Sequence, residues 1–367
     1  MSAEKPELNR FAFALHPVDM TDVIRFEPGT AGRRPEVVEK VLEWLPAYEL
    51  SHITGIRSPT GAEAEGWFIV VPYLPHQYLE FSRETIMEKI MGADEIASEY
   101  GARIMGLGGF NSVISRGGSS VAKRSRIAIT TGNSFTIATA VEGALTGARI
   151  LGIEPSDAVA TVVGASGAVG NVCARLLAAS VGELHLVARG RQRLSNLASE
   201  IADQTGREPI IADDLSAALP VSDIVISATS SGGQVVAAKD LKSGSIVCDV
   251  AVPYDISRDV AESRPDVLVI EGGLVEVPGT IDLGFDIGYP PGVVLACMAE
   301  TMILCLEGRF EHASIGRNIS LQEVEDIRAL ADKHGFKLAG FRSFDRAVTD
   351  EQIERVRASA STAPRAE

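Results

Sequence analysis

The sequence predicts an α/β protein: a Rossmann-like, doubly wound parallel sheet, with an N-terminal α+β substrate domain before it and C-terminal helices after it. First, short β-branched runs alternate with helical segments from Ala158 onward, the pattern of a parallel sheet covered on both faces. Second, a glycine-rich turn follows the first of these runs. Third, 367 residues suffice for two domains that each have a core.

Composition predicts a globular protein of the cytoplasm. The chain is 46% hydrophobic and 23% charged. Its opening residues, MSAEKPELNR, lack the basic and apolar segments of a secretion signal. The most apolar stretch, 293–306, contains Glu300 and is shorter than the ~20 residues that cross a bilayer. Four cysteines without regular spacing indicate reduced thiols.

The formal net charge of −15 argues against general nucleic-acid binding, which requires a basic surface. The Gly/Ser-rich stretch SRGGSSVAKRSR is a local exception, with Arg116, Lys123, Arg124 and Arg126 close together. Taken alone, such a cluster is more often a solvated loop than a binding surface.

The first part of the chain mixes strands and helices. Apolar spacing and turn residues predict a helix in 33–45, a β-hairpin in 52–74, a helix in 82–102, a short strand in 103–115 and a helix in 133–152. The polar start of the last helix offers Asn133 or Ser134 as its cap.

We expect four regions along the chain. These are an N-terminal α+β substrate domain with its connecting helix (1–150), a Rossmann domain (151–290), C-terminal helices that carry the candidate nucleophile (291–340), and an extension (341–367). The end of the extension, RASASTAPRAE, has the composition of a disordered tail.

The glycine-rich loop TVVGASGAVGN predicts a dinucleotide site. Gly164 permits the tight turn, Gly167 allows the backbone to approach a pyrophosphate, and Gly170 allows close helix–strand packing. The G-x-x-G-x-x-G spacing is a variant of the usual fingerprint, so its strand–turn–helix context carries the prediction; the alternative is an ordinary tight turn. The expected cofactor contacts here are Gly164, Ala165, Ser166, Gly167, Ala168, Val169 and Gly170.

Arginines after the next strand favour NADPH over NADH. NAD enzymes usually place an acidic residue there for the ribose hydroxyls, whereas this strand ends LVARGRQR. Arg189, with Arg191 and Arg193 behind it, suits a 2′-phosphate, and Arg189 and Arg191 are the expected contacts; alternatively these arginines only solvate the next helix. We also expect Thr229 and Ser230, at the end of the run over 223–230, to bind the cofactor.

Three of the four cysteines have the spacing of core residues. Cys173 and Cys305 share helical faces with apolar residues, and Cys248 alternates with apolar residues in a strand. Cys297 differs, because Pro290, Pro291 and Gly292 force a helix to begin near residue 293, which puts the thiol in its second turn. The positive helix end would favour a thiolate there. From the residues alone, Cys297 is either core or catalytic.

Several stretches, in the same order along the chain, resemble the cyanobacterial-type long-chain acyl-[acyl-carrier-protein] reductases. The resemblance covers roughly 50–340 and includes LGGFNSVI, TTGNSFTIA, VVGASGAVGNVCARLL, VIEGGLVEV, ACMAETM, SIGRN and KHGF. It implies reduction of a fatty acyl thioester to an aldehyde with NADPH, through an acylated cysteine that matches Cys297. It also implies the glycine loop as the NADPH site.

The chain departs from that family in three places. Phe135 stands where the family has a histidine, the segment before Cys297 is proline-rich and short, and the residues from about 341 have no counterpart. These departures leave the acyl length and the carrier, acyl carrier protein or CoA, open. Contact with a membrane surface stays an option for long acyl chains, and the oligomeric state is open.

Covalent reduction also needs oxyanion and proton donors. Asn133, Ser134 and Thr136 at a helix start are candidates, with His334 for proton transfer; helix capping and a surface position are the structural alternatives. No cluster has metal-ligand spacing. Two other functions remain open: an NADPH-dependent alcohol or hydroxy-acid dehydrogenase of the shikimate-dehydrogenase kind, and a dinucleotide-sensing regulator without catalysis.

Overall fold

A computed structural model describes residues 8–231, 233–344 and 346–362, and these divide into two compact units. The first unit comprises the chain up to Asn133 together with Val275–Gly316 and Asp326–Lys337. The second comprises Ser134–Leu274, Arg317–Glu325 and the chain from Leu338.

This division differs from the four regions expected from the sequence. The helix after the N-terminal strands groups with the dinucleotide-type unit, and the segment with Cys297 groups with the N-terminal unit. Sequence order does not reveal that the chain returns to the first unit after the second, because this return depends on which sheet the later helix packs against.

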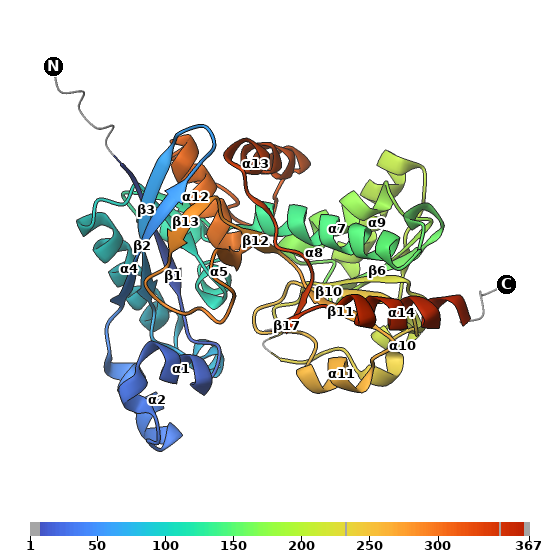
Figure 1. Ribbon diagram of the computed structural model, residues 1–367, viewed down its shortest axis with the longest axis horizontal. Coiled ribbons are helices and arrows are strands. Elements are labelled where there is room, and N and C mark those ends of the chain that lie inside the picture. Colours follow the sequence, from blue (N-terminus) through green and yellow to red (C-terminus); the bar gives the residue numbers. More distant parts are fainter. Residues whose placement is uncertain (1–7, 232, 345, 363–367) are drawn as a thin grey trace. The chain divides into compact units, whose positions relative to one another are not determined.

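The first unit contains a mixed six-stranded sheet in the order β13-β2-β3-β1-β4-β5 (Figure 1). Its strands are β1 (Asn9–Leu15), β2 (Tyr48–Arg57), β3 (Glu63–Val70), β4 (Ile104–Leu107), β5 (Ala128–Thr130) and β13 (Gly279–Asp282). β2 and β3 pair antiparallel, which confirms the predicted hairpin. β1 pairs parallel with both β3 and β4, and β4 pairs parallel with β5.

Two long helices pack against this sheet: α4 (Arg83–Glu99), which Ser82 caps, and α12 (Ala296–Glu307). Apolar side chains of α4, among them Ile86 and Ile90, enter the core with those of β1 and β4. α12 crosses β4 so closely that a Cβ on Gly106 would lie 2.2 Å from Thr301 Oγ1. The glycine therefore permits the packing that fixes the Cys297 helix on the sheet.

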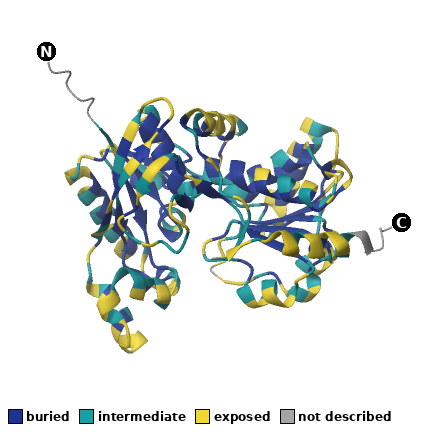
Figure 2. Cartoon of the chain, viewed as in Figure 1, coloured by how far each residue is buried: buried dark blue, intermediate teal, exposed yellow. Residues whose placement is uncertain are grey.

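The remaining elements of this part of the chain are short or peripheral. They are α1 (Met20–Phe26), η1 (Pro28–Thr30), α2 (Pro35–Trp44), α3 (Pro75–Glu80), α5 (Phe110–Ile114), α6 (Ser119–Ala122), β12 (Leu274–Glu276), β14 (Val293–Leu295), α13 (Leu321–His334) and β15 (Lys337–Leu338). The predicted helix in 33–45 is confirmed as α2, which is exposed along much of its length (Figure 2).

The second unit is a doubly wound α/β domain, as the sequence predicts. Its parallel sheet has the order β11-β10-β9-β6-β7-β8. The strands are β6 (Val159–Val163), β7 (Glu183–Val187), β8 (Ile210–Ile211), β9 (Ile224–Ser227), β10 (Ile246–Asp249) and β11 (Leu268–Glu271). Except in the short edge strand β8, their central residues are buried (Figure 2). The chain moves outward from β6 in one direction and then outward from β9 in the other, so a topological switch lies between these strands.

Helices cover both faces of this sheet (Figure 1). They are α7 (Asn133–Ile150), α8 (Ala168–Ala178), α9 (Arg191–Thr205), α10 (Leu215–Ala218), α11 (Arg258–Ser263) and α14 (Asp350–Thr362), with the short turns η2 (Pro155–Asp157), η3 (Leu219–Val221) and η4 (Ala238–Asp240), and the strands β16 (Arg342–Ser343) and β17 (Arg346–Ala347).

One expectation about the C-terminus is wrong. The tail was expected to lack structure from 357, but α14 continues to Thr362 because Val356 is buried and Ala360 lies against Gly244. Residues 363–367 are outside the described part of the chain. No helix among the described residues is long and apolar enough to cross a membrane.

Candidate functional site

The glycine-rich loop lies at the topological switch of the second unit, between the ends of β6 and β9. Gly164 has φ +80°, a left-handed conformation that favours glycine, and α8 begins after Gly167. The first N–H groups of a helix have no acceptor within it, so the start of α8 offers backbone donors and a positive dipole end to phosphates.

The loop tolerates no side chain at two of its glycines. A Cβ on Gly164 would lie 2.5 Å from the carbonyl oxygen of Ala228, and one on Gly170 would lie 2.4 Å from that of Gly164. Ala165 is fully buried, so it can meet a cofactor only through its backbone, whereas Ser166 is partly exposed. Because no side chains project from Gly164 and Gly170, the backbone of the loop fits the close approach of a pyrophosphate.

The arginines after β7 have different surroundings. Arg189 is exposed and makes no hydrogen bond or ion pair with a described residue. Arg191 forms an ion pair with Asp213, which follows β8. Arg193, which was expected with Arg191 behind Arg189, has its Nε 3.4 Å from the position that a Cβ on Gly190 would take. Ser166 Oγ lies 3.6 Å from that same position. Arg193 therefore joins Arg189 as a candidate 2′-phosphate contact.

A buried aspartate orders the other end of the cofactor site. Asp255 is 1% exposed, and its Oδ2 accepts hydrogen bonds from Ser227 Oγ at 2.7 Å and from the Thr229 N–H at 2.9 Å. The Thr229 hydroxyl also donates to this carboxylate. Thr229 is thus held in place at the end of β9, and Ser230 beside it is exposed.

Cys297 lies in the first turn of α12, not in the second as expected. The helix begins at Ala296 because β14 occupies Val293–Leu295 and continues directly into it. Solvent reaches Cys297 in part, whereas Cys173, Cys248 and Cys305 are buried. The expected core positions of those three cysteines are therefore confirmed.

A glycine of the β5–α7 connection lies against the thiol residue. A Cβ on Gly132 would be 2.5 Å from Cys297 Cβ and 2.2 Å from its Cα, so only glycine allows this approach. Asn133 follows directly and is partly exposed. α7 begins at Asn133, so neither Asn133 nor Ser134 occupies the expected cap position before the helix. Ser134 is buried and Thr136 is partly exposed; both belong to the second unit.

Glu300, one turn after Cys297, links three segments of the first unit. It is 1% exposed, and its Oε1 accepts hydrogen bonds from Thr130 Oγ1 and Ser314 Oγ, each at 2.6 Å. Thr130 Oγ1 in turn accepts from the Gly132 N–H at 3.1 Å. The buried carboxylate therefore helps to hold the loop that contacts Cys297.

The thiol of Cys297 is protonated in the free protein. Burial raises its pKa to about 12; the N–H groups of Met298 and Cys297 oppose this rise, and the charge of Glu300 adds to it. The helix terminus was expected to favour a thiolate, but desolvation outweighs it here. A nucleophilic role then requires that a proton leave during attack.

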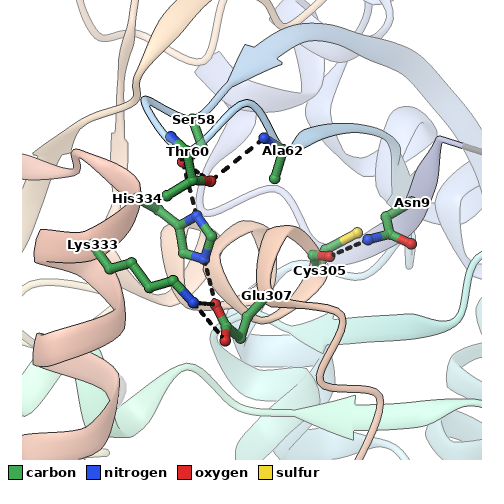
Figure 3. Close-up of polar contacts among 8 residues, drawn as sticks. All are labelled: Asn9, Ser58, Thr60, Ala62, Cys305, Glu307, Lys333 and His334. Atoms are coloured by element: carbon green, nitrogen blue, oxygen red, sulfur yellow. Dashed lines mark hydrogen bonds and ion pairs between the residues drawn. The ribbon is translucent and has the colours of Figure 1, made fainter. Parts of the chain in front are cut away.

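His334 lies near the opposite end of α12 from the Cys297 thiol. Its Nδ1 lies 2.9 Å from Ser58 Oγ, and its Nε2 donates to Glu307 Oε2 at 2.8 Å (Figure 3). Glu307 ends α12, ten positions after Cys297, so at 1.5 Å per residue the two are about 15 Å apart. His334 is 1% exposed, not on the surface, and it joins α13 to α12 and the hairpin.

No group of three or more His, Cys, Asp or Glu side chains within the described ranges has the arrangement of a metal site.

The fold and the glycine loop together define an NAD(P)-binding protein of the dehydrogenase and reductase class. In agreement, residues 147–271 match the family model for shikimate / quinate 5-dehydrogenase.

Over 297 residues the chain is 31% identical to the long-chain acyl-[acyl-carrier-protein] reductase of Synechococcus elongatus, covering 77% of this chain and 85% of that protein. It belongs to the family of long-chain acyl-[acyl-carrier-protein] reductases. It is also 33% identical over 304 residues to the aminotransferase PigE of a Serratia species, covering 81% of this chain but only 35% of that longer protein.

Solved structures resemble the chain more remotely. L-tryptophan dehydrogenase from Nostoc punctiforme is 12% identical with a TM-score of 0.42, covering 96% of this chain and 88% of that one. Glutamyl-tRNA reductase from Methanopyrus kandleri is 19% identical with a TM-score of 0.29, covering 78% and 59%.

Sequence analysis assigned no role to three residues that the structure adds to the candidate sites: Gly132, Glu300 and Asp255. Gly132 and Glu300 lie within the stretches TTGNSFTIA and ACMAETM, but a spacing argument gave them no role. Asp255 follows a proline and a tyrosine in an irregular segment, where no periodicity marks it.

Proposed function

We propose that this protein reduces a fatty acyl thioester to the aldehyde with NADPH, through an acyl-enzyme on Cys297. The observation that carries the proposal is that Cys297, alone among the four cysteines, is reached by solvent, in a chain of this family.

The chemistry divides into two transfers. The Cys297 sulfur bonds to the acyl carbon, the carrier's sulfur leaves, and the thiol proton goes with it. When bound, NADPH supplies the hydride that reduces the acyl carbon. Hydride addition leaves a thiohemiacetal alkoxide, which re-forms the carbonyl, breaks its carbon–sulfur bond and releases the aldehyde, and the Cys297 sulfur takes up one proton to restore the thiol. Covalent capture replaces one difficult step with two easier ones and holds the carbonyl in place.

The residues around the thiol have distinct proposed tasks. The N–H groups of Cys297 and Met298, at the positive end of α12, stabilise negative charge on sulfur as it develops. Asn133, beside Gly132, is the favoured side-chain donor to the acyl oxygen; Ser134 and Thr136 are further candidates. Because His334 lies at the far end of α12, we assign it to positioning that helix and not to proton transfer.

The glycine loop, Thr229 and Ser230 hold the cofactor, and Arg189 and Arg193 select NADPH by its 2′-phosphate. Arg191, which was expected to share this task, has Asp213 as a partner and contributes less.

The covalent step is tested by intact mass after incubation with palmitoyl-CoA in the absence of NADPH. Cys297→Ser is expected to bind NADPH but to form neither adduct nor aldehyde, because a hydroxyl without a base stays protonated. Cys305→Ser is the matched control: it should keep the adduct and lose stability, since the hydroxyl replaces a buried thiol. An adduct that survives in Cys297→Ser and disappears in Cys305→Ser would reverse the assignment.

The match of residues 147–271 favours one competing function, an NADPH-dependent dehydrogenase acting on an alcohol or hydroxy acid. Such an enzyme needs no cysteine, so full activity on an alcohol in Cys297→Ser, with no acylation of the unsubstituted protein, would select it.

A further inference from the structure

Four cations of the first unit are exposed on or near the helix α6. They are Arg116, Lys123, Arg124 and Arg126. Within the described part of the chain, none of their side chains has a hydrogen-bond or ion-pair partner. By contrast, the neighbouring Arg83 donates to Ile114 O at 2.9 Å and also to Ser120 Oγ. Free positive charge is therefore concentrated on one segment of a protein whose net charge is −15.

The backbone presents the first of these cations in an unusual way. Arg116 has φ +58°, a left-handed conformation that is unfavourable for a non-glycine residue. Gly117 and Gly118 continue the turn with φ +63° and +76°. Such strain persists only where the surroundings fix it, and it concentrates at functional segments.

The basic segment packs on the same strand-end loops that surround the thiol. Gly117 O accepts a hydrogen bond from the Gly316 N–H at 2.6 Å, and a Cβ on Gly118 would meet Ile315 and Thr131 at 2.8 and 3.1 Å. Thr131 is adjacent in sequence to Gly132, which lies against Cys297. A large molecule docked on the basic segment would thus be near the nucleophile.

We propose that the segment from Arg116 to Arg126 is the docking surface for an acidic carrier protein that delivers the acyl thioester. This inference rests on the proposed function and names the partner of the same site. An anionic protein is repelled at long range by a host with a net charge of −15, and an unneutralised local cluster is the feature that offsets this repulsion and guides the encounter.

The test compares two double variants that change the charge equally. Arg124→Glu with Arg126→Glu alters the segment, while Arg328→Glu with Lys337→Glu alters two exposed cations elsewhere in the first unit that also lack described partners. Each protein is assayed on a palmitoyl-loaded acyl carrier protein and on the uncharged palmitoyl thioester of N-acetylcysteamine.

We expect the segment variant to lose about 10-fold or more in kcat/KM on the carrier substrate, with less than about a twofold change on the small thioester. The control variant should lose less on the carrier. High salt should remove most of the difference, because exposed charges are screened beyond about 10 Å at 0.1 M ionic strength.

Direct binding separates this inference from the proposed function. Labelled carrier protein should bind the unsubstituted protein and the control more tightly than the segment variant, whether or not aldehyde forms. Equal losses on both thioesters, or equal binding by both variants, would overturn the docking surface while leaving the reductase function intact. Tighter binding of a labelled single-stranded oligonucleotide than of carrier protein would overturn it in favour of nucleic acid. If neither thioester yields aldehyde, the proposed reductase function is contradicted, while the docking surface is still judged by the binding measurement.

Discussion

Two opposing electrostatic effects act on Cys297. Its place in the first turn of α12 brings backbone N–H groups to the sulfur, while burial and the nearby Glu300 disfavour the thiolate. The balance leaves the thiol with a raised pKa, so the free protein should react slowly with alkylating agents near neutral pH. In the proposed mechanism, activation then depends on the bound substrate, which protects the thiol from unproductive reactions.

Glu300→Gln should make this thiol more reactive. Removing a negative charge near sulfur stabilises the thiolate, so the pKa falls from about 12 and the thiolate fraction at any lower pH rises. Below the pKa, each unit of decrease raises the alkylation rate about tenfold. The measurement is the rate of iodoacetamide labelling of Cys297 against pH, by peptide mass. Since glutamine can still accept hydrogen bonds from Thr130 and Ser314, an unchanged rate profile would show that the charge does not act on the thiol.

Arg193→Ala should weaken NADPH binding about 10-fold and leave NADH binding unchanged, because only NADPH carries the 2′-phosphate. Arg191→Ala is the matched control, since that guanidinium already pairs with Asp213. Fluorescence titration of both cofactors with both variants measures the effect. Equal weakening of NADH and NADPH would argue against a phosphate contact at Arg193.

At the residue scale, the sequence separated Cys297 from the other cysteines because Pro290, Pro291 and Gly292 place it close to the start of a helix. It could not predict the sign of the thiol's pKa shift. That sign depends on desolvation by segments distant in sequence, such as the one that brings Gly132 against Cys297.

At the level of helices and strands, two glycines differ in how much space their surroundings leave for a side chain. Gly170 has no room for a Cβ, because the carbonyl oxygen of Gly164 lies in its place. Gly92, inside α4, has room, since a Cβ would meet only Ala47 Cβ at 3.8 Å.

Alanine should therefore have opposite effects at these two positions. Gly92→Ala is expected to raise the free energy of unfolding by about 0.5–1 kcal/mol, from helix propensity and a less flexible unfolded chain. Gly170→Ala should lower it by about 1–3 kcal/mol through overpacking and reduce NADPH affinity. Urea titration measures both. A neutral Gly170→Ala with normal cofactor binding would show that the loop is not tightly packed.

The elements that periodicity marks clearly, such as α4, α8 and the hairpin, could be predicted from the sequence. The start of α12 could not. Val293–Leu295 continues the apolar pattern of the helix, and only pairing in a sheet makes it a strand. α14 was missed for a related reason: its alanines and serines look unstructured until Gly244 is seen to receive Ala360.

On the scale of the whole molecule, each unit has a core of its own. Ile86, Ile90 and Met105 belong to the first, and Val163, Val225 and Val247 to the second. The sequence predicted the parallel sheet of the second unit and its flanking helices α8 and α9, because strands and helices alternate locally, but not that α7 and α14 belong to this unit. It did not predict that 275–316 returns to the first unit, because that depends on contacts across more than 150 positions.

NADPH at 100 times its dissociation constant should stabilise the second unit by about 2.7 kcal/mol. If the two units unfold independently, the most protected amides of β6 and β9 will exchange about 100-fold more slowly with NADPH, while those of β1 and β4 will not change. Hydrogen exchange followed by mass spectrometry distinguishes the cases. Equal slowing in both units would mean that they unfold as one cooperative body.

The length of the helix α12 fixes the distance and the rotation between Cys297 and Glu307. Cys297 stands near one end, and Glu307 at the other is tied to His334 and Lys333 of α13 (Figure 3). One inserted residue would rotate the thiol by about 100° relative to that anchor and shift it by about 1.5 Å. Across evolution, the ten-residue spacing between Cys297 and Glu307 should therefore resist insertions and deletions, even where individual side chains change. The preceding segment 283–292, mostly without regular structure, is free to vary in length.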